Sequence, residues 1–305
     1  MSVVAAALAI ALLGPAVTPK GVALRVPLRA PVMAQSQAQP FDSGTAGVAQ
    51  DKPRITNGRI EPHTVSAGLA KDLPALAAKL TEPTWIGYTA PMTDGEHHMC
   101  DYWNDNGRNS YSYSNAPVHL EPPDFFFVLF RVESGQIVRI RTYSADCPLD
   151  AGGKAVHWFT NVTPADSLNY LKAFVAAPST SSRILDSAVT AIALHEGQPA
   201  LDMLIALARD NASTKIRGNA LFWLAQRAGQ KAVGTITAAI DNDPDTEVKK
   251  KAVFALSQLP KDEGVPLLIQ QARTNKNAAV RKQAMFWLGQ SKDPRALKFF
   301  EEILR

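Results

Sequence analysis

The chain has 305 residues, of which 46% are hydrophobic and 20% are charged, and its formal net charge is +4. A chain of this length can form two domains with a substantial core, and its composition argues against wholesale disorder and against a protein with many membrane spans. From position 180 onward there are 18 Lys and Arg against 13 Asp and Glu. This excess is too small and too dispersed to indicate nucleic-acid binding, so we expect no nucleic-acid partner.

The N-terminal segment begins with an uncharged, mostly apolar run at residues 2–17. The run is too short for a comfortable membrane span and is typical of the hydrophobic region of a signal peptide. A secretory signal normally carries its positive charge first, whereas Lys20, Arg25 and Arg29 follow the run. We predict that residues 1–34 are a signal peptide or a short anchor, and hence a periplasmic or secreted protein. Membrane attachment is expected only through this segment, if it stays uncleaved.

The next segment changes in composition. Residues 35–54 are rich in Gln, Ser, Ala, Gly and Asp, which is typical of a flexible linker. The Asn57-Gly58 pair lies between two short apolar flanks and indicates a hairpin turn. Residues 65–80 then carry leucines at helical spacing, which predicts a short amphipathic helix: Leu69, Leu73, Leu76 and Leu80.

From Trp85 the pattern favours strands. The clearest are residues 125–132 and 137–143, joined by a turn that contains Gly135. Their alternation predicts a half-buried antiparallel sheet, with one apolar face that includes Val128, Phe130, Val132, Val138 and Ile140. We therefore predict a small β-containing domain over residues 55–160.

Both cysteines, Cys100 and Cys147, fall in this predicted β domain. In an exported chain, two cysteines in one small domain favour a disulfide. The bond would close a loop of about 47 residues and contribute on the order of 3–4 kcal/mol.

A metal site in the same region is the competing interpretation. The segment 96–101 is dense in ligand types, and the candidate metal ligands are His97, His98, His119 and His157. Zinc binds Cys and His in tetrahedral sites, but no pair here has the spacing of a recognised zinc motif. The chain also lacks a GxSxG motif and a Gly-rich phosphate loop, so the sequence predicts no catalytic residue and no cofactor.

A nine-residue phrase repeats three times in the C-terminal part, at an offset of 32 residues. It begins at Ile216, Val248 and Val280. A fixed period of this length is typical of a solenoid, here with units of roughly 180–211, 212–243, 244–276 and 277–305. Each unit predicts two helices, because a second set of apolar columns keeps the same period. Those columns are Leu201, Val233, Val265 and Leu297; Leu204, Ile236, Leu268 and Phe300; and Ala208, Ile240, Ala272 and Leu304.

The repeated residues resemble those of a known family. The stretch Asp245-x-x-Val248-Lys249-x-x-Ala252-x-x-x-Leu256 is similar to the HEAT repeat in its short PBS-lyase HEAT-like form. The resemblance covers about 125 residues and implies an all-α solenoid over 164–305. The segment around Trp85 to Cys100 also resembles a segment that precedes HEAT repeats in exported bacterial proteins.

The resemblance implies a structural role for one basic position. In HEAT repeats the basic residue after Val or Ile packs between successive units, and Arg217, Lys249 and Arg281 match it. The recurring Trp223 and Trp287 are interpreted as core residues.

The resemblance does not extend to the enzymes that share this repeat. Nothing in the chain indicates the chromophore site of the bilin lyases. Deoxyhypusine hydroxylase uses several His-Glu pairs as iron ligands, whereas the repeats here hold one, at His195-Glu196.

The sequence therefore predicts an α+β protein, with a small antiparallel β domain followed by a HEAT-like solenoid. Its predicted function is a non-catalytic scaffold of the bacterial envelope that binds a protein partner through the solenoid. The alternative is a metal-binding protein or enzyme with a site in the 96–157 region. Neither the partner nor the oligomeric state follows from the sequence.

Overall fold

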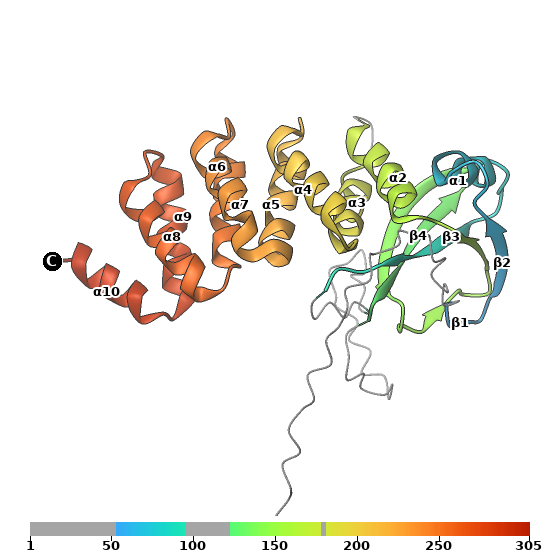
Figure 1. Cartoon of the computed structure of the whole chain (residues 1–305), viewed down its shortest axis with the longest axis horizontal. Helices are drawn as coiled ribbons and strands as arrows, with labels where there is room; N and C mark the ends of the chain where they lie inside the picture. The colour runs from blue at the N-terminus through green and yellow to red at the C-terminus, as the bar shows by residue number, and fades with distance from the viewer. Residues whose placement is uncertain (1–52, 95–99, 101–122, 178–180) are drawn as a thin grey trace, which may run out of the picture. The chain divides into compact units, whose positions relative to one another are not determined.

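The computed structural model describes residues 53–94, 100, 123–177 and 181–305. The predicted signal segment and nearly all of the predicted linker lie outside these residues. Within them, a β-sheet with a short helix is followed by helices arranged in pairs (Figure 1). No helix in this described part is both long and apolar enough to cross a membrane.

Five strands of the described chain form the main sheet, in the order β2-β7-β3-β4-β5. Their bounds are β2 Arg59–Thr64, β3 Thr84–Pro91, β4 Phe125–Glu133, β5 Gln136–Ser144 and β7 Ala155–Thr160. β4 is antiparallel to β3 and β5, whereas β7 is parallel to β2 and β3.

The sheet is therefore mixed, and the prediction of an antiparallel sheet was wrong. The reason is the connection between β2 and β3, which passes through the helix α1 (Leu69–Ala77). A helical crossover leaves two strands running in the same direction, and here β7 lies between them. The Asn57-Gly58 turn is also not a hairpin turn. It links β1 (Ile55–Thr56), which pairs with β6 (Leu149–Asp150), to β2, which pairs with β7.

The predicted hairpin of β4 and β5 is present. Its two turn residues, Ser134 and Gly135, both have positive φ, at 48° and 75°, as a type I′ turn requires. A bulge follows, so that Val132 pairs with Ile137 and Arg131 with Arg139. Val138 is thus the extra residue and is 42% exposed, so its predicted place on the apolar face was wrong.

The sheet is buried on both faces along β4 rather than half-buried. One face packs against α1 and against α2 (Pro164–Ala176) and α3 (Ser182–Leu194), and its core is continuous with the core of the later helices. The other face carries a smaller cluster that includes Phe127, Leu129 and Trp158. Gly87 lies in β3 on this second face, where an added Cβ would come within 2.7 Å of Trp158.

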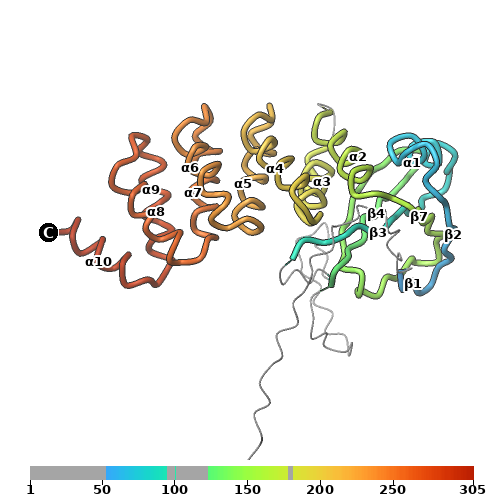
Figure 2. Tube along the Cα trace, viewed as in Figure 1, coloured from blue at the N-terminus to red at the C-terminus, as the bar shows by residue number. Residues whose placement is uncertain are grey.

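Within residues 181–305 the helices form four pairs, which follow one another in a row away from the sheet (Figure 2). The first helices are α3, α5 (Thr214–Ala228), α7 (Thr246–Ser257) and α9 (Ala278–Ser291). The second helices are α4 (Gln198–Asp210), α6 (Val233–Asn242), α8 (Lys261–Thr274) and α10 (Pro294–Ile303).

The first, fifth and ninth positions of the nine-residue repeat are buried in all three copies, because they face the neighbouring helices. They are Ile216, Val248 and Val280; Ala220, Ala252 and Ala284; and Leu224, Leu256 and Leu288. The last pair departs from the predicted second-helix columns, since Leu297 and Leu304 are 62% and 84% exposed.

A buried chain of hydrogen bonds joins β3 of the sheet to α2 and α3. Tyr88 of β3 lies 2.7 Å from the Ser167 hydroxyl of α2, which lies 2.8 Å from Nε2 of His195 at the end of α3. His195 Nδ1 lies 2.7 Å from the Ala191 carbonyl, so Nδ1 carries the proton and Nε2 accepts from Ser167. All three side chains are fully buried. The Ser–His pair is therefore a structural contact and not an exposed nucleophile.

Candidate functional site

Only one of the predicted metal-ligand candidates can be placed. His97, His98 and His119 lie outside the described residues. His157 lies on β7, directly opposite Glu61 on the parallel strand β2. Two residues further along β2, His63 shares the face of Glu61, because side chains alternate along a strand. His157 Nδ1 lies 3.0 Å from His63 Nε2 and 3.3 Å from Glu61 Oε2.

The environment of this histidine cluster (Glu61, His63 and His157) sets its protonation. Burial lowers the pKa of His157, an effect that the Glu61 carboxylate partly opposes. A hydrogen bond from Arg59 lowers the pKa of Glu61. At neutral pH the cluster therefore holds an uncharged His157 beside a charged carboxylate. Glu61 and His63 are half-buried, so the cluster is reached from the edge of the sheet.

The predicted disulfide is present between Cys100 and Cys147. Together with Asp146, the two sulfurs form the other group of metal-ligand types among the described residues. Because disulfide sulfurs are not thiolates, that group is not a metal site in this state.

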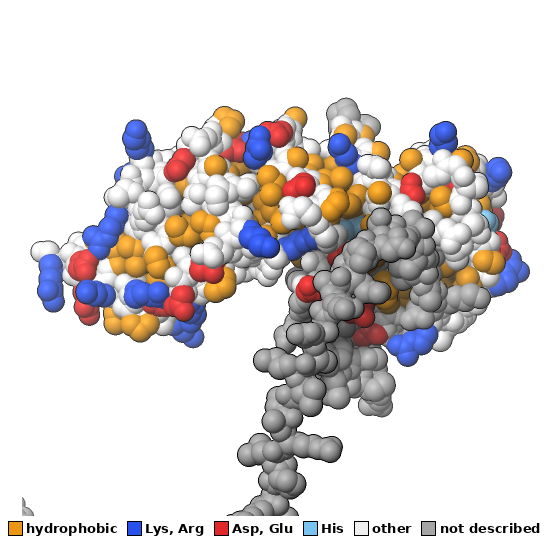
Figure 3. All heavy atoms as spheres, viewed as in Figure 1, with side chains coloured by type: hydrophobic (Ala, Val, Ile, Leu, Met, Phe, Trp, Pro, Cys, Tyr) orange, Lys and Arg blue, Asp and Glu red, His pale blue; other side chains and the backbone are white. Residues whose placement is uncertain are grey.

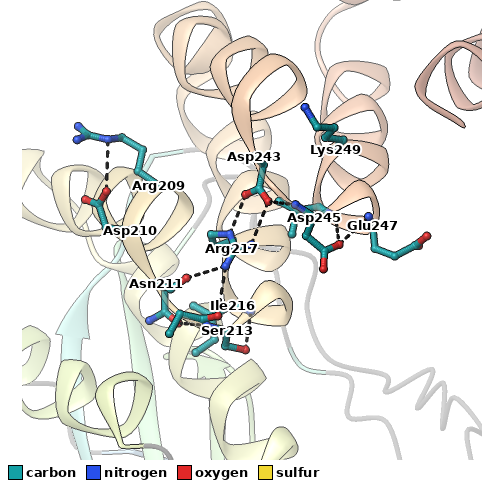
Figure 4. A network of polar contacts seen from close by, with 12 residues as sticks. Arg209, Asp210, Asn211, Ser213, Ile216, Arg217, Asp243, Asp245, Glu247 and Lys249 are labelled. Atoms are coloured by element: carbon teal, nitrogen blue, oxygen red, sulfur yellow. Dashed lines mark hydrogen bonds and ion pairs between the residues drawn. The ribbon is translucent and has the colours of Figure 1, made fainter. Parts of the chain in front are cut away.

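The predicted stacking residues all bind the end of a preceding second helix. Arg217 Nη1 donates to the Asn211 carbonyl over 2.8 Å, at the C-cap of α4 (Figure 4). Lys249 donates to the Ile240 carbonyl of α6 over 2.8 Å, and Arg281 to the Asn275 carbonyl after α8 over 2.8 Å. Cations at the C-terminus of a helix satisfy its free carbonyls and its dipole. A role of these contacts in stacking the units stays a prediction.

Arg217 differs from the other two because it also forms a buried ion pair. Its Nε and Nη2 donate to the two carboxylate oxygens of Asp243 over 2.7 and 3.0 Å (Figure 4). Burial favours the protonated form of Asp243, but hydrogen bonds from Arg217 and the Asp245 amide hold its pKa below the usual value. The N-cap of α7 is the neighbouring Asp245, which accepts from the Val248 amide.

An aromatic row crosses the helices α5, α7 and α9. It consists of Phe222, Phe254 and Phe286, one from each copy of the repeat, of which the first two are half-buried. Trp223 and Trp287 lie beside them, are half-buried and pack against the core. The rings of Phe222 and Phe254 are parallel at 5.9 Å, and Phe254 lies 4.9 Å from Trp287. Phe286 is 53% exposed. Figure 3 also shows hydrophobic side chains gathered over α3, α4 and α5 between charged ones.

The first helices α5, α7 and α9 are basic, whereas the second helices together carry a small excess of acidic residues. Helices α5, α7 and α9 contain eight Lys and Arg and a single acidic residue, Glu247. Helices α4, α6, α8 and α10 contain five Lys and Arg against seven Asp and Glu. The aromatic row therefore lies on the positively charged layer of the solenoid.

Sequence reasoning missed parts of each site. Glu61 and His63 were visible only as a Glu-x-His alternation, and their partner His157 lies 94 residues after His63. The three phenylalanines stood in the repeat phrase, but a column of aromatics reads as core until its exposure is known. Ser167 carried no signal.

The C-terminal helices match a known family. The family described as HEAT repeats matches residues 201–265 and 234–305. No curated protein matches the chain in sequence.

Solved structures match parts of the chain at low similarity. The chain is similar to the CpcE–CpcF complex of phycocyanin lyase from Nostoc sp. PCC7120, to human deoxyhypusine hydroxylase in complex with glycerol, and to the Escherichia coli protein YibA. The identities are 16%, 18% and 21%, and the TM-scores are 0.36, 0.34 and 0.33. The match covers 45%, 41% and 46% of this chain, and 89%, 43% and 54% of those chains. At these values the similarity transfers no activity to this chain.

Proposed function

Since residues 201–305 are HEAT repeats, we propose that this protein is a non-catalytic scaffold of the bacterial envelope that binds a protein partner through its solenoid. Solenoids of this kind offer an extended surface on which each unit adds one set of side chains. The proposal assigns no reaction to the chain.

The observation that carries the proposal is the aromatic row on the basic layer. Exposed aromatic side chains are enriched where proteins bind one another, since they supply large contact area at a small cost in conformational entropy. The surrounding excess of Lys and Arg favours a partner of the opposite charge. The partner is therefore a segment that carries apolar side chains among Asp and Glu.

Selection of displayed peptides on the immobilised full chain tests this chemistry. We expect the enriched peptides to combine acidic and apolar residues. Their binding should fall at least about tenfold in Phe222→Ser/Phe286→Ser, because a few residues, often aromatic, carry most of the binding energy of a protein interface. Leu297→Ser is the control, because Leu297 is exposed like Phe286 but lies on a second helix.

A second pair of variants tests the charge. Lys251→Glu/Lys282→Glu on the first helices should weaken binding and reduce its dependence on salt, whereas Lys261→Glu/Lys298→Glu on the second helices should not. Enrichment of basic peptides, or equal loss in both pairs, would contradict the proposed surface.

Location in the envelope rests on two observations. Residues 2–17 form an uncharged apolar run, and the chain carries a disulfide, which persists in oxidising compartments. Cell fractionation with peptide mapping of the mature N-terminus tests this part. The expected result is an envelope protein without residues 1–34, or with them retained as an anchor. Recovery in the cytoplasm with Cys100 and Cys147 reduced would refute it.

A further inference from the structure

The histidine cluster brings three atoms with lone pairs to one point, and a hydrogen on either ring nitrogen pairs only two of them well. Nδ1 of His157 faces both Nε2 of His63 at 3.0 Å and Oε2 of Glu61 at 3.3 Å. One proton on Nδ1 can point at only one of these atoms, and the carboxylate brings none of its own. A proton on His63 would serve His157 but leave the Glu61 oxygen facing a lone pair. A single cation at the centre satisfies all three atoms together.

The distances are those of ligands around one metal ion. Zinc lies about 2.0–2.1 Å from its nitrogen and oxygen ligands, so two ligands are about 2.9 Å apart at a right angle and about 3.4 Å apart at a tetrahedral angle. The two contacts of His157 fall in this range. The three ligand atoms all lie within 4.8 Å of one another.

The backbone holds these side chains in place before any ion binds. Glu61 and His157 are register partners on adjacent parallel strands, and His63 is two residues along β2. Phe159 packs against the His63 ring with centroids 5.5 Å apart. Arg59 binds Oε1 of Glu61, which leaves Oε2 directed toward His157. Supporting contacts of this kind orient metal ligands and raise affinity.

We propose that Glu61, His63 and His157 form a site for a zinc-like divalent transition-metal ion at the edge of the sheet. Two imidazoles and one carboxylate select such ions over Mg²⁺ and Ca²⁺, which prefer oxygen ligands. Three protein ligands leave at least one coordination position for water or another small ligand, and that side opens to solvent past the half-buried Glu61 and His63. The site lies on the sheet and is independent of the proposed partner surface on the solenoid.

Metal binding to the purified full chain, stripped with a chelator, tests the site. Titration with Zn²⁺ should give one ion per chain with a dissociation constant on the order of 1 µM or tighter. Co²⁺ should give the visible absorption of a low-coordinate site, and Mg²⁺ should not compete. A weaker dissociation constant, on the order of 1 mM, would refute the proposal.

The variants identify the ligands. His63→Ala should weaken Zn²⁺ binding at least about tenfold to a hundredfold, and Glu61→Gln should do the same, since each removes one ligand. Glu133→Gln is the control, because it makes the same change on an exposed carboxylate at the hairpin turn, away from the cluster. His63 and Glu61 are half-buried at the edge of the sheet, so the far-ultraviolet circular dichroism of these variants should match that of the parent chain. Full-strength zinc binding in Glu61→Gln/His63→Ala would place the ion elsewhere and overturn the proposal.

Discussion

In the solenoid one kind of contact is made again and again, whereas in the sheet each contact is made once. Arg217, Lys249 and Arg281 repeat a bond from a first helix to the end of a second helix. The sheet instead depends on single arrangements, such as the Tyr88–Ser167–His195 chain and the histidine cluster. Each copy joins a different pair of helices, whereas each contact of the sheet occurs at one place only. The repeated polar contacts therefore follow the 32-residue period, whereas the contacts of the sheet join residues that are far apart in the sequence.

The largest expected loss of stability comes from Arg217, which differs from Lys249 and Arg281 by its buried ion pair. Arg217→Ala should destabilise the chain by about 3–5 kcal/mol, because it leaves Asp243 buried without its partner. Arg281→Ala loses hydrogen bonds to carbonyls only and should cost about 1 kcal/mol. Urea denaturation measures both. Equal losses would mean that the ion pair adds nothing to the repeated contact. Arg217→Met/Asp243→Leu should recover much of the loss, since a well-packed apolar pair replaces a buried ion pair at little cost.

The next effect tests a contact made once, in the β region. Cys100→Ser/Cys147→Ser should lower the free energy of unfolding by about 3–4 kcal/mol, because the disulfide joins positions 47 residues apart and restricts the unfolded chain. Denaturation of the parent chain with and without a thiol reductant gives the same comparison without mutation. If reduction leaves the parent chain unchanged while the double variant loses stability, packing of the serines rather than the cross-link would be responsible.

The solenoid was predictable from the sequence, whereas the order of strands in the sheet was not. The columns of Ile216, Ala220 and Leu224 with their copies lie at a fixed period, so local pattern alone located the solenoid helices. The mixed sheet was not predictable in this way. The position of β7 between β2 and β3 depends on pairing between distant segments, and no local pattern encodes strand order. The histidine cluster is a product of that pairing, so it could not be assembled from the sequence.

Acid should weaken the Tyr88–Ser167–His195 contact between the sheet and the solenoid. Burial lowers the pKa of His195 from its usual 6.5 to about 4. The hydrogen bond to the Ala191 carbonyl raises the pKa by a smaller amount, and the charge of Arg227 lowers it slightly further. Between pH 6.5 and 4 the histidine is protonated in the unfolded chain but not in the folded chain. The contribution of His195 to the free energy of unfolding is therefore complete above pH 6.5 and is lost as the pH falls toward 4. The difference between these two pKa values corresponds to about 3 kcal/mol of folding free energy.

His195→Gln separates this contribution from other titrating groups. Glutamine carries no charge at any pH and can still bond to Ser167. The difference in unfolding free energy between the variant and the parent chain should therefore vary between pH 6.5 and 4 and stay constant above 6.5. Parallel pH curves for the two proteins would show that His195 does not report on this contact.

The smallest effect distinguishes two glycines that both lie in second helices of the repeats. Gly234 in α6 has no atom within 4 Å of an added Cβ, so Gly234→Ala should stabilise the chain by about 0.5–1 kcal/mol through helix propensity. In α8, a Cβ on Gly264 would lie 2.4 Å from the Leu256 carbonyl oxygen of α7. Gly264→Ala should therefore destabilise by about 1–3 kcal/mol, because backbone must shift to admit the methyl group. Thermal denaturation of the two variants gives changes of opposite sign. A stabilised Gly264→Ala would mean that α7 and α8 separate freely at this point, and that the two helices of this pair are packed less tightly than the 2.4 Å approach indicates.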